Sequence, residues 1–291
     1  MEITLPAFNH ILMEFGSGFG LMAPVILFIY LRNKRKCAIL PVIAGIVAML
    51  GFAFALEQFF HAFVFSTGLG KAIQNNLVLY SLYGGLAAGI FEETGRWFAF
   101  RFVLKDEYRE NDRNALMYAV GHGGVEMFII LTVNYSTFLF YFAMIESGGM
   151  AALTQGLDAA AAEDLTQQLT MLAQSSPLVY IMAIMERISA MLAHMGLSVL
   201  VWFSLGGKGT GDHKKYLFLA VALHALLDTV TTLAAGFISN IQIVEIIVFV
   251  LALGILFIAK RVWAEEHDPE QDRKLRGVRV GRMARRSARK L

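Results

Sequence analysis

Long apolar segments alternate with short polar connections along most of the chain. A helix needs about 20 mostly apolar residues to cross a hydrocarbon core about 30 Å thick, and about seven segments reach that length. We expect membrane-spanning helices over residues 15–31, 37–65, 77–104, 114–143, 177–205, 215–238 and 241–262. The pattern therefore predicts an all-α, polytopic transmembrane helical bundle, a multi-pass protein of the cell membrane.

The composition excludes a soluble globular protein. Hydrophobic residues make up 57% of the 291 residues and charged residues only 16%, whereas charged residues average about a quarter of soluble sequences. The single cysteine, Cys37, also excludes an internal disulfide and a zinc site built from cysteines.

Basic residues are distributed unevenly among the connections. There are 21 Lys and Arg residues in four segments, namely the connections after the first, third and fifth expected spans and the segment from Lys260 onward. The other connections hold only Lys71. Because basic residues mark the cytoplasmic side of a membrane protein, we expect the N-terminus outside and the C-terminus in the cytoplasm. The first ten residues contain no Lys or Arg, so we expect no cleaved signal peptide.

Two segments do not fit a membrane span. Residues 146–176 contain acidic residues and no basic one, and Asp158 to Leu172 has apolar residues at helical spacing. We expect an external amphipathic helix there, on the membrane surface or over the bundle, with a solvated connector as the alternative. We expect one transmembrane domain over residues 1–263. Residues 264–291 are rich in Lys and Arg, so we expect them to form a disordered cytoplasmic tail. Such a tail should bind anionic lipid headgroups, and we expect it to bind no nucleic acid.

Ionisable residues interrupt the apolar segments. They are Glu57, His61, Glu92, Glu93, Arg96, His122, Glu126, Glu186, Arg187, His194, His224 and Asp228. Each charged side chain that faces lipid at the centre of a membrane helix costs roughly 2.5 to 3.5 kcal/mol. Several of these residues are four apart and therefore share one helix face. We expect five helices to present these polar faces to a single polar centre.

The densest charge surrounds Glu92. Arg96 is four residues after Glu92 and three after Glu93, so on a helix it neighbours both carboxylates and can keep them ionised. The Gly-rich stretch 84–89 precedes them and contains a Gly-x-x-x-Gly step, which lets another helix approach closely. The segment is therefore expected to pack against partner helices.

These side-chain types fit a hydrolase that uses activated water. A carboxylate can take a proton from water, imidazoles can bind a metal ion or hold an oxyanion, and an arginine can fix a carboxylate. The His-Glu-x-x-His signature of helix-borne zinc sites is absent. Residues 209–212 have the Gly-x-Gly-Asp form of aspartyl intramembrane proteases, but they lie in a polar loop, so we interpret them as a turn.

Four motifs in order carry a resemblance to a known family. They are Glu92-Glu93-Thr94-Gly95-Arg96, Gly121-His122-Gly123-Gly124-Val125-Glu126, Glu186-Arg187 with His194, and His224-Ala225-Leu226-Leu227-Asp228. With these motifs the chain resembles the YhfC family of glutamic-type intramembrane proteases. It is similar in motif order to the PrsW proteases and, more distantly, to the CAAX-processing (CPBP) endopeptidases. The Glu-Glu-x-x-Arg spacing is one residue shorter than in the CAAX-processing pattern, so the resemblance does not extend to an isoprenylated substrate.

The resemblance implies a set of site residues. The catalytic residues would be Glu92, Glu93, Glu126, His194, His224 and Asp228, with supporting roles for Arg96, His122 and Arg187. Either Glu92 or Glu93 would be the general base, and Asp228 would orient His224 one helical turn away. His194 and His224 are the candidate ligands of a divalent metal such as zinc. The same set also works without a metal if the imidazoles donate hydrogen bonds.

We therefore expect an intramembrane endopeptidase that acts on a membrane protein or peptide. A proton-coupled transporter is the main alternative, because intramembrane acids and histidines also form proton relays. Carriers often contain two repeated halves, and the polar motifs of this chain do not repeat. A non-catalytic membrane scaffold is the third alternative.

Overall fold

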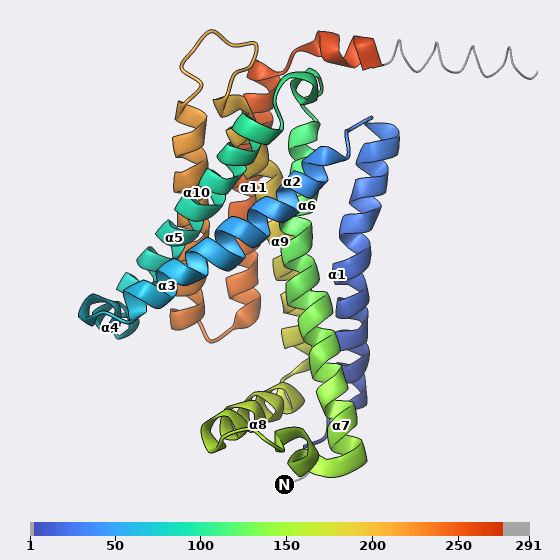
Figure 1. The fold of residues 1–291 in the computed structure, drawn as a ribbon, viewed down its shortest axis with the longest axis vertical. Coiled ribbons are helices and arrows are strands. Elements are labelled where there is room, and N and C mark those ends of the chain that lie inside the picture. Colours follow the sequence, from blue (N-terminus) through green and yellow to red (C-terminus); the bar gives the residue numbers. More distant parts are fainter. Residues whose placement is uncertain (1–2, 276–291) are drawn as a thin grey trace, which may run out of the picture.

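Helices account for all regular structure in residues 3–275, which are the residues that the computed structural model describes. The α-helices, labelled as in Figure 1, are α1 (Ala7–Lys34), α2 (Leu40–Ala48), α3 (Gln58–Phe65), α4 (Gly68–Gln74), α5 (Leu77–Phe98), α6 (Asn114–Met127), α7 (Asn134–Thr154), α8 (Ala159–Gln174), α9 (Pro177–Ser204), α10 (Lys215–Phe237) and α11 (Ile241–Glu266). Three π-helices continue or join them, η1 (Met49–Glu57), η2 (Ala99–Val103) and η4 (Phe128–Val133), and η3 (Asp106–Glu110) is a 3-10 helix. The all-α class predicted from the sequence is confirmed.

Six helical segments within the described residues are long and apolar enough to cross a membrane. They are Ala7–Lys34, Leu40–Phe65, Asn114–Thr154, Pro177–Ser204, Lys215–Phe237 and Ile241–Glu266. These segments confirm a multi-pass membrane protein. The helix α5, which carries Glu92, Glu93 and Arg96, is not among the six, so the expected count of about seven spans stays a prediction.

Two helices extend beyond the limits expected from hydropathy. The helix α1 begins at Ala7 rather than near residue 15, and its early residues His10 and Glu14 lie on an exposed face. The helix that starts as α6 does not end near residue 143 but continues to a kink at Gly149, where φ is 74°. Its length to that kink is about 50 Å at 1.5 Å per residue, well beyond the ~30 Å hydrocarbon core. Hydropathy marks only the part of a helix that faces lipid, so it misses such extensions.

The helix expected between Asp158 and Leu172 is present as α8. The Asp158 side chain accepts a hydrogen bond from the Ala161 N–H at 2.8 Å, which caps the first turn. Buried Leu169 of α8 packs with Phe142 of α7, so α8 folds back against the end of α7, as Figure 1 shows. Its external location stays a prediction.

The basic connections gather at one end of the bundle. Figure 1 places the connection between α1 and α2, that between α5 and α6, that between α9 and α10 and the end of α11 at the top, whereas α4 and α8 lie lower. This arrangement agrees with the alternation of basic and non-basic connections in the sequence. The assignment of the top to the cytoplasm stays a prediction.

Glycines bring two pairs of helices into backbone contact. A Cβ added to Gly121 of α6 would lie 2.0 Å from the Val42 carbonyl oxygen of α2, and one added to Gly85 of α5 would lie 2.5 Å from the Ala225 carbonyl oxygen of α10. Both separations are far shorter than van der Waals contact, so only glycine fits. The Gly-rich stretch before Glu92 therefore packs against a partner helix, as expected.

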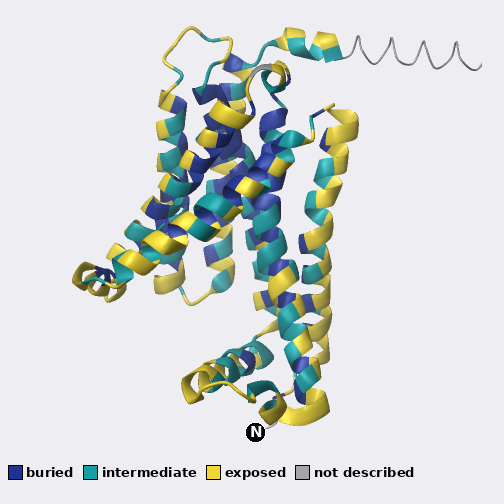
Figure 2. Cartoon of the chain, in the orientation of Figure 1, coloured by how far each residue is buried: buried dark blue, intermediate teal, exposed yellow. Residues whose placement is uncertain are grey.

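Buried positions concentrate in the upper half of the bundle, as Figure 2 shows. Nearly every position of α6 is buried up to Gly124, whereas Val125 and Glu126 are only partly buried. The helix α3 has no buried residue at all. The transition in α6 marks the lower edge of the buried core, and the ionisable residues lie at this edge.

A polar cluster joins the segment after α11 to the connection before α6. The Asp112 carboxylate accepts hydrogen bonds from Trp202 Nε1 at 2.9 Å and from His267 Nδ1 at 2.7 Å. In the same region the Arg109 guanidinium lies 3.9 Å from the centre of the Trp202 ring, and burial lowers the pKa of Arg109 to about 10. The start of the expected tail is thus held against the bundle. Residues 276–291, where the expected disorder and lipid binding mostly fall, lie outside the described residues.

Candidate active site

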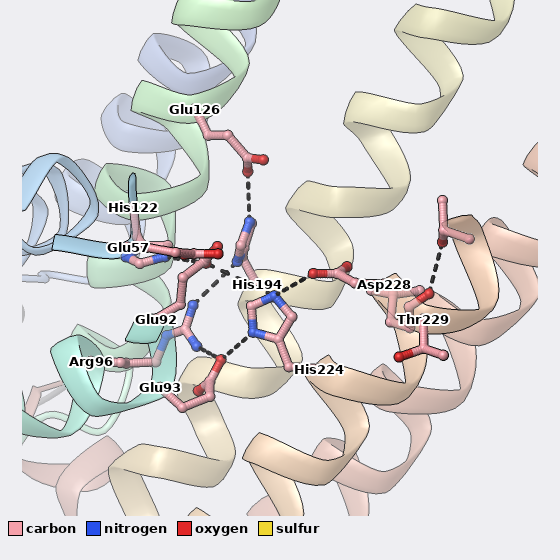
Figure 3. Close-up of polar contacts among 12 residues, drawn as sticks. Glu57, Glu92, Glu93, Arg96, His122, Glu126, His194, His224, Asp228 and Thr229 are labelled. Carbon is pink, nitrogen blue, oxygen red and sulfur yellow. Dashed lines mark hydrogen bonds and ion pairs between the residues drawn. The ribbon is translucent and has the colours of Figure 1, made fainter. Parts of the chain in front are cut away.

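Four helices bring ionisable side chains to one place in the bundle (Figure 3). The helix α5 supplies Glu92, Glu93 and Arg96, α6 supplies His122 and Glu126, α9 supplies His194, and α10 supplies His224 and Asp228. The helix α9 also supplies Arg187, which pairs with Glu126. Within each helix the spacing of three or four residues, or of seven in α9, places these side chains on one face. The π-helices η2 and η4 begin shortly after these residues in α5 and α6, and such turns are frequent at functional sites.

Glu93 is fully buried and holds two partners. Its Oε1 atom accepts hydrogen bonds from Arg96 and, at 2.7 Å, from His224 Nδ1. Because an ionised carboxylate only accepts hydrogen bonds, Nδ1 of His224 carries a hydrogen. The other ring nitrogen, Nε2, lies 3.5 Å from Asp228 Oδ2 and 3.9 Å from Glu92 Oε2. His224 is therefore surrounded by three carboxylates.

Glu92 faces the adjacent helix α6. Its Oε2 atom lies 2.9 Å from His122 Nε2. The other ring nitrogen of His122 is 3.4 Å from the Tyr118 hydroxyl, one helical turn earlier. His122 and Tyr118 are both fully buried. The imidazole is thus fixed at both ends and presents Nε2 to the carboxylate.

His194 is held between a carboxylate and a guanidinium. Its Nε2 atom lies 2.7 Å from Glu126 Oε2, and its Nδ1 atom lies 3.2 Å from Arg96 Nη2. A guanidinium only donates hydrogen bonds, so Nδ1 is the acceptor and Nε2 donates to Glu126. Glu126 in turn accepts a hydrogen bond from Arg187 at 2.8 Å, and Arg187 also pairs with Glu186. The lone pair of His194 Nδ1 therefore faces the Arg96 guanidinium at the centre of the site.

Three of these residues form a group that can hold a metal ion. Glu92, His122 and His194 each offer one ligand atom, and these atoms lie within 4.8 Å of one another. Two imidazoles and one carboxylate match the protein ligands of catalytic zinc sites that keep an open position. Glu126 holds the second nitrogen of His194, which is the usual arrangement around metal-binding histidines. The donor set therefore fits a divalent metal such as zinc.

The nine site residues expected from the sequence form one connected set. The expected metal pair, His194 with His224, differs from the group above, because His122 takes the place of His224 beside His194. His224 instead contacts Glu93, so its role as a metal ligand stays a prediction. Tyr118 also belongs to the site but was not expected there, although its position four residues before His122 places it on the same helix face.

Comparisons with known proteins show the family of the chain. The model of the family described as "YhfC intramembrane metalloprotease" matches residues 19–248. The chain is also 28% identical over 258 residues to "Uncharacterized membrane protein YhfC" of Bacillus subtilis (strain 168), covering 87% of this chain and 97% of that protein. No solved structure matches the chain. The resemblance to the YhfC family is confirmed, whereas the likeness to the PrsW and CAAX-processing proteases is not shown. The chain belongs to the YhfC intramembrane metalloprotease family.

Proposed function

We propose that the chain is an endopeptidase that hydrolyses a peptide bond of a membrane protein or peptide within or near the bilayer, with a divalent metal such as zinc held by Glu92, His122 and His194. The observation that carries the proposal is the meeting of these three ligand atoms within 4.8 Å. The group is buried between long apolar helices, so its substrate has to enter from the membrane. An apolar peptide segment fits that environment.

The residues around the group supply acid and base chemistry. A bound metal of this kind lowers the pKa of water and polarises a carbonyl oxygen. Asp228, whose side chain is 37% exposed, accepts the proton of the attacking water. His224, protonated on both ring nitrogens among its three carboxylates, donates its Nε2 proton to the nitrogen of the breaking peptide bond, which leaves as an amine. Proton transfer from Asp228 to His224, across the 3.5 Å between them, restores both groups.

Glu93 and Glu126 act as positioning residues in this scheme. Glu93 fixes His224 through Nδ1, and Arg96 balances its charge. Glu126 fixes His194, and Arg187 balances its charge. This assignment differs from the sequence-based interpretation that Glu92 or Glu93 is the general base. In a metal-free peptidase Glu92 would take the proton, because Glu93 is already bound by Arg96 and His224.

Metal content tests the proposal directly. Detergent-purified wild type is compared with the variant His122→Ala/His194→Ala by mass spectrometry, and with His10→Ala as an exposed control on α1. We expect about one zinc per chain in the wild type and the control, loss in the double variant, and loss of cleavage of a transmembrane reporter after chelation. A metal-free wild type that cleaves the reporter in the presence of chelator would refute the metal-dependent peptidase and leave the glutamic one.

The transporter alternative predicts a different result. A metal-free chain that cleaves no reporter but gives pH-dependent solute flux in reconstituted vesicles would establish a carrier. Intramembrane acids and histidines suit both functions, so flux and cleavage are measured on the same preparation. A chain that shows neither activity and no metal would fit the scaffold alternative.

A further inference from the structure

A second polar group lies beside the site, between α3 and α5. His61 Nδ1 is 2.8 Å from the Tyr83 hydroxyl, and His61 Nε2 is 3.2 Å from Glu57 Oε1. Glu57 lies within electrostatic range of Glu92 and Asp228, and Figure 3 shows it at the edge of the site. Tyr83, His61 and Glu57, here named the outer polar chain, take no part in the mechanism proposed above.

The outer polar chain crosses a seam that is otherwise aromatic. Phe60 of α3 lies 5.4 Å from Phe91 of α5 between ring centres, and Phe65 of α3 lies 6.3 Å from Tyr80. No glycine of α3 or α5 brings their backbones together, in contrast to the contact of α5 with α10 at Gly85. Polar side chains in such a membrane-embedded seam are costly and usually have a function.

Within the outer polar chain, Glu57 is more buried than His61. Tyr83 is half-buried, the His61 side chain is 20% exposed, and the Glu57 side chain is 8% exposed. Tyr83 is six residues beyond Leu77, the first residue of α5, or about 9 Å along the axis, and Glu92 is about 22 Å along it. Tyr83 therefore lies between the lower end of α5 and the depth of Glu92, and its hydrogen-bonded contact with His61 continues to Glu57.

We propose that the outer polar chain is the passage by which water reaches the site from the side of the membrane on which α4 lies. This inference rests on the proposed hydrolase, because hydrolysis consumes a water molecule for each bond, and the hydrocarbon core contains almost none. The Tyr83 hydroxyl, the His61 imidazole and the Glu57 carboxylate offer hydrogen-bonding groups at successive depths. Water molecules that hydrogen-bond to these groups in turn approach Glu92.

Radiolytic hydroxyl-radical labelling tests the passage without any assay of cleavage. Radicals made from water modify side chains that water touches, and His122 is fully buried by the surrounding protein. We expect labelling of His61 and His122 in the full-length wild type in lipid nanodiscs, and none of buried Trp202. In His61→Phe, whose new ring can keep the stacking of His61 on Phe65, labelling of His122 should fall about threefold or more, since one polar step is lost.

Kinetics of reporter cleavage supply the second readout. His61→Phe and Tyr83→Phe should lower kcat about tenfold, the scale of one lost hydrogen bond, and leave KM within about twofold. The matched control is Tyr80→Phe, which removes a hydroxyl one turn earlier on α5, from a ring that stacks on Phe65, and it should change neither constant.

The two readouts separate the passage from the enzyme. Unchanged His122 labelling in His61→Phe, or an unchanged kcat in that variant, would overturn the passage. If the wild type cleaves no peptide but its His122 labelling still depends on His61, the passage stands and only the proposed peptidase fails.

Discussion

Gly123 of α6 offers a direct test of the role of His194. A Cβ added to Gly123 would lie 2.7 Å from His194 Cδ2 and 3.3 Å from His194 Cβ, whereas carbon atoms in contact prefer about 3.5 to 4.0 Å. Gly123→Ala therefore has to displace the His194 ring by about 1 Å. The same movement strains the 2.7 Å hydrogen bond between His194 and Glu126.

We expect Gly123→Ala to damage function more than stability. A misplacement of about 1 Å at a catalytic group costs about 100-fold in rate, and an extra methyl in a packed region costs about 1 to 3 kcal/mol of folding free energy. The measurements are kcat/KM on a transmembrane reporter, zinc content, and the midpoint of thermal unfolding in detergent. Rate and zinc content should both fall, while the protein remains folded.

Gly124→Ala is the matched control. It adds a methyl to the next residue of the same helix, where Cβ would lie 2.9 Å from Pro24 Cβ on α1 and away from His194. It should lower the unfolding midpoint by a similar amount and leave the zinc content and the rate per folded molecule unchanged. Equal rates and equal zinc contents in the two variants would refute a role for His194 in the site.

Three further predictions concern packing, metal affinity and the single thiol. Gly85→Ala should prevent stable folding, because its Cβ would lie 2.5 Å from the Ala225 carbonyl oxygen, whereas Gly84→Ala, with nothing within 4 Å, should unfold at the wild-type temperature. Glu126→Gln should weaken zinc affinity about 10-fold to 100-fold in a competition titration, because it weakens the support of His194. Burial raises the pKa of Cys37 from 9.0 to about 12. The folded chain therefore keeps the thiol proton to higher pH than the unfolded chain, so the free energy of unfolding should fall as pH rises from about 9 to about 12 in denaturant titrations. A maleimide at pH 8 should label Cys37 only after unfolding.

The sequence predicts the polar centre well because a charge in a membrane is expensive. Glu93, Arg96 and His224 each interrupt an apolar helix, and the cost of facing lipid leaves the interior of the bundle as the remaining place for them. Helical spacing then identifies the face of each helix that carries them. The all-α class and the convergence of polar helix faces on one centre follow from these two arguments alone. The expected count of five helices differs from the four that form the site, because His61 pairs with Tyr83 and Glu57 beside it.

Partners across different helices do not follow from spacing. His122 and His224 each stand four residues from a carboxylate on their own helix, so the sequence gives no reason to place one rather than the other beside His194. The choice depends on the packing of α6 against α9, where Gly123 lets the His194 ring approach. The four-residue spacing of Tyr118 and His122 places both on one helix face, but their contact also depends on the side-chain rotamers, which the sequence does not specify.

The distribution of counter-ions explains how the site can keep several carboxylates inside a membrane and still leave one free to act. Glu93, which holds His224, is paired with Arg96, and Glu126, which holds His194, is paired with Arg187, so these two buried negative charges are balanced by guanidinium groups that stay protonated at any working pH. Within residues 3–275 the ion-pair partner of Asp228 is the His224 imidazole at 3.5 Å, and Asp228 is the most exposed of these carboxylates. Because an imidazole can lose its proton, the Asp228 pair can change its charge during a reaction while the two arginine pairs cannot. Chemistry that moves protons is therefore expected on α10, and rigid support on α5, α6 and α9.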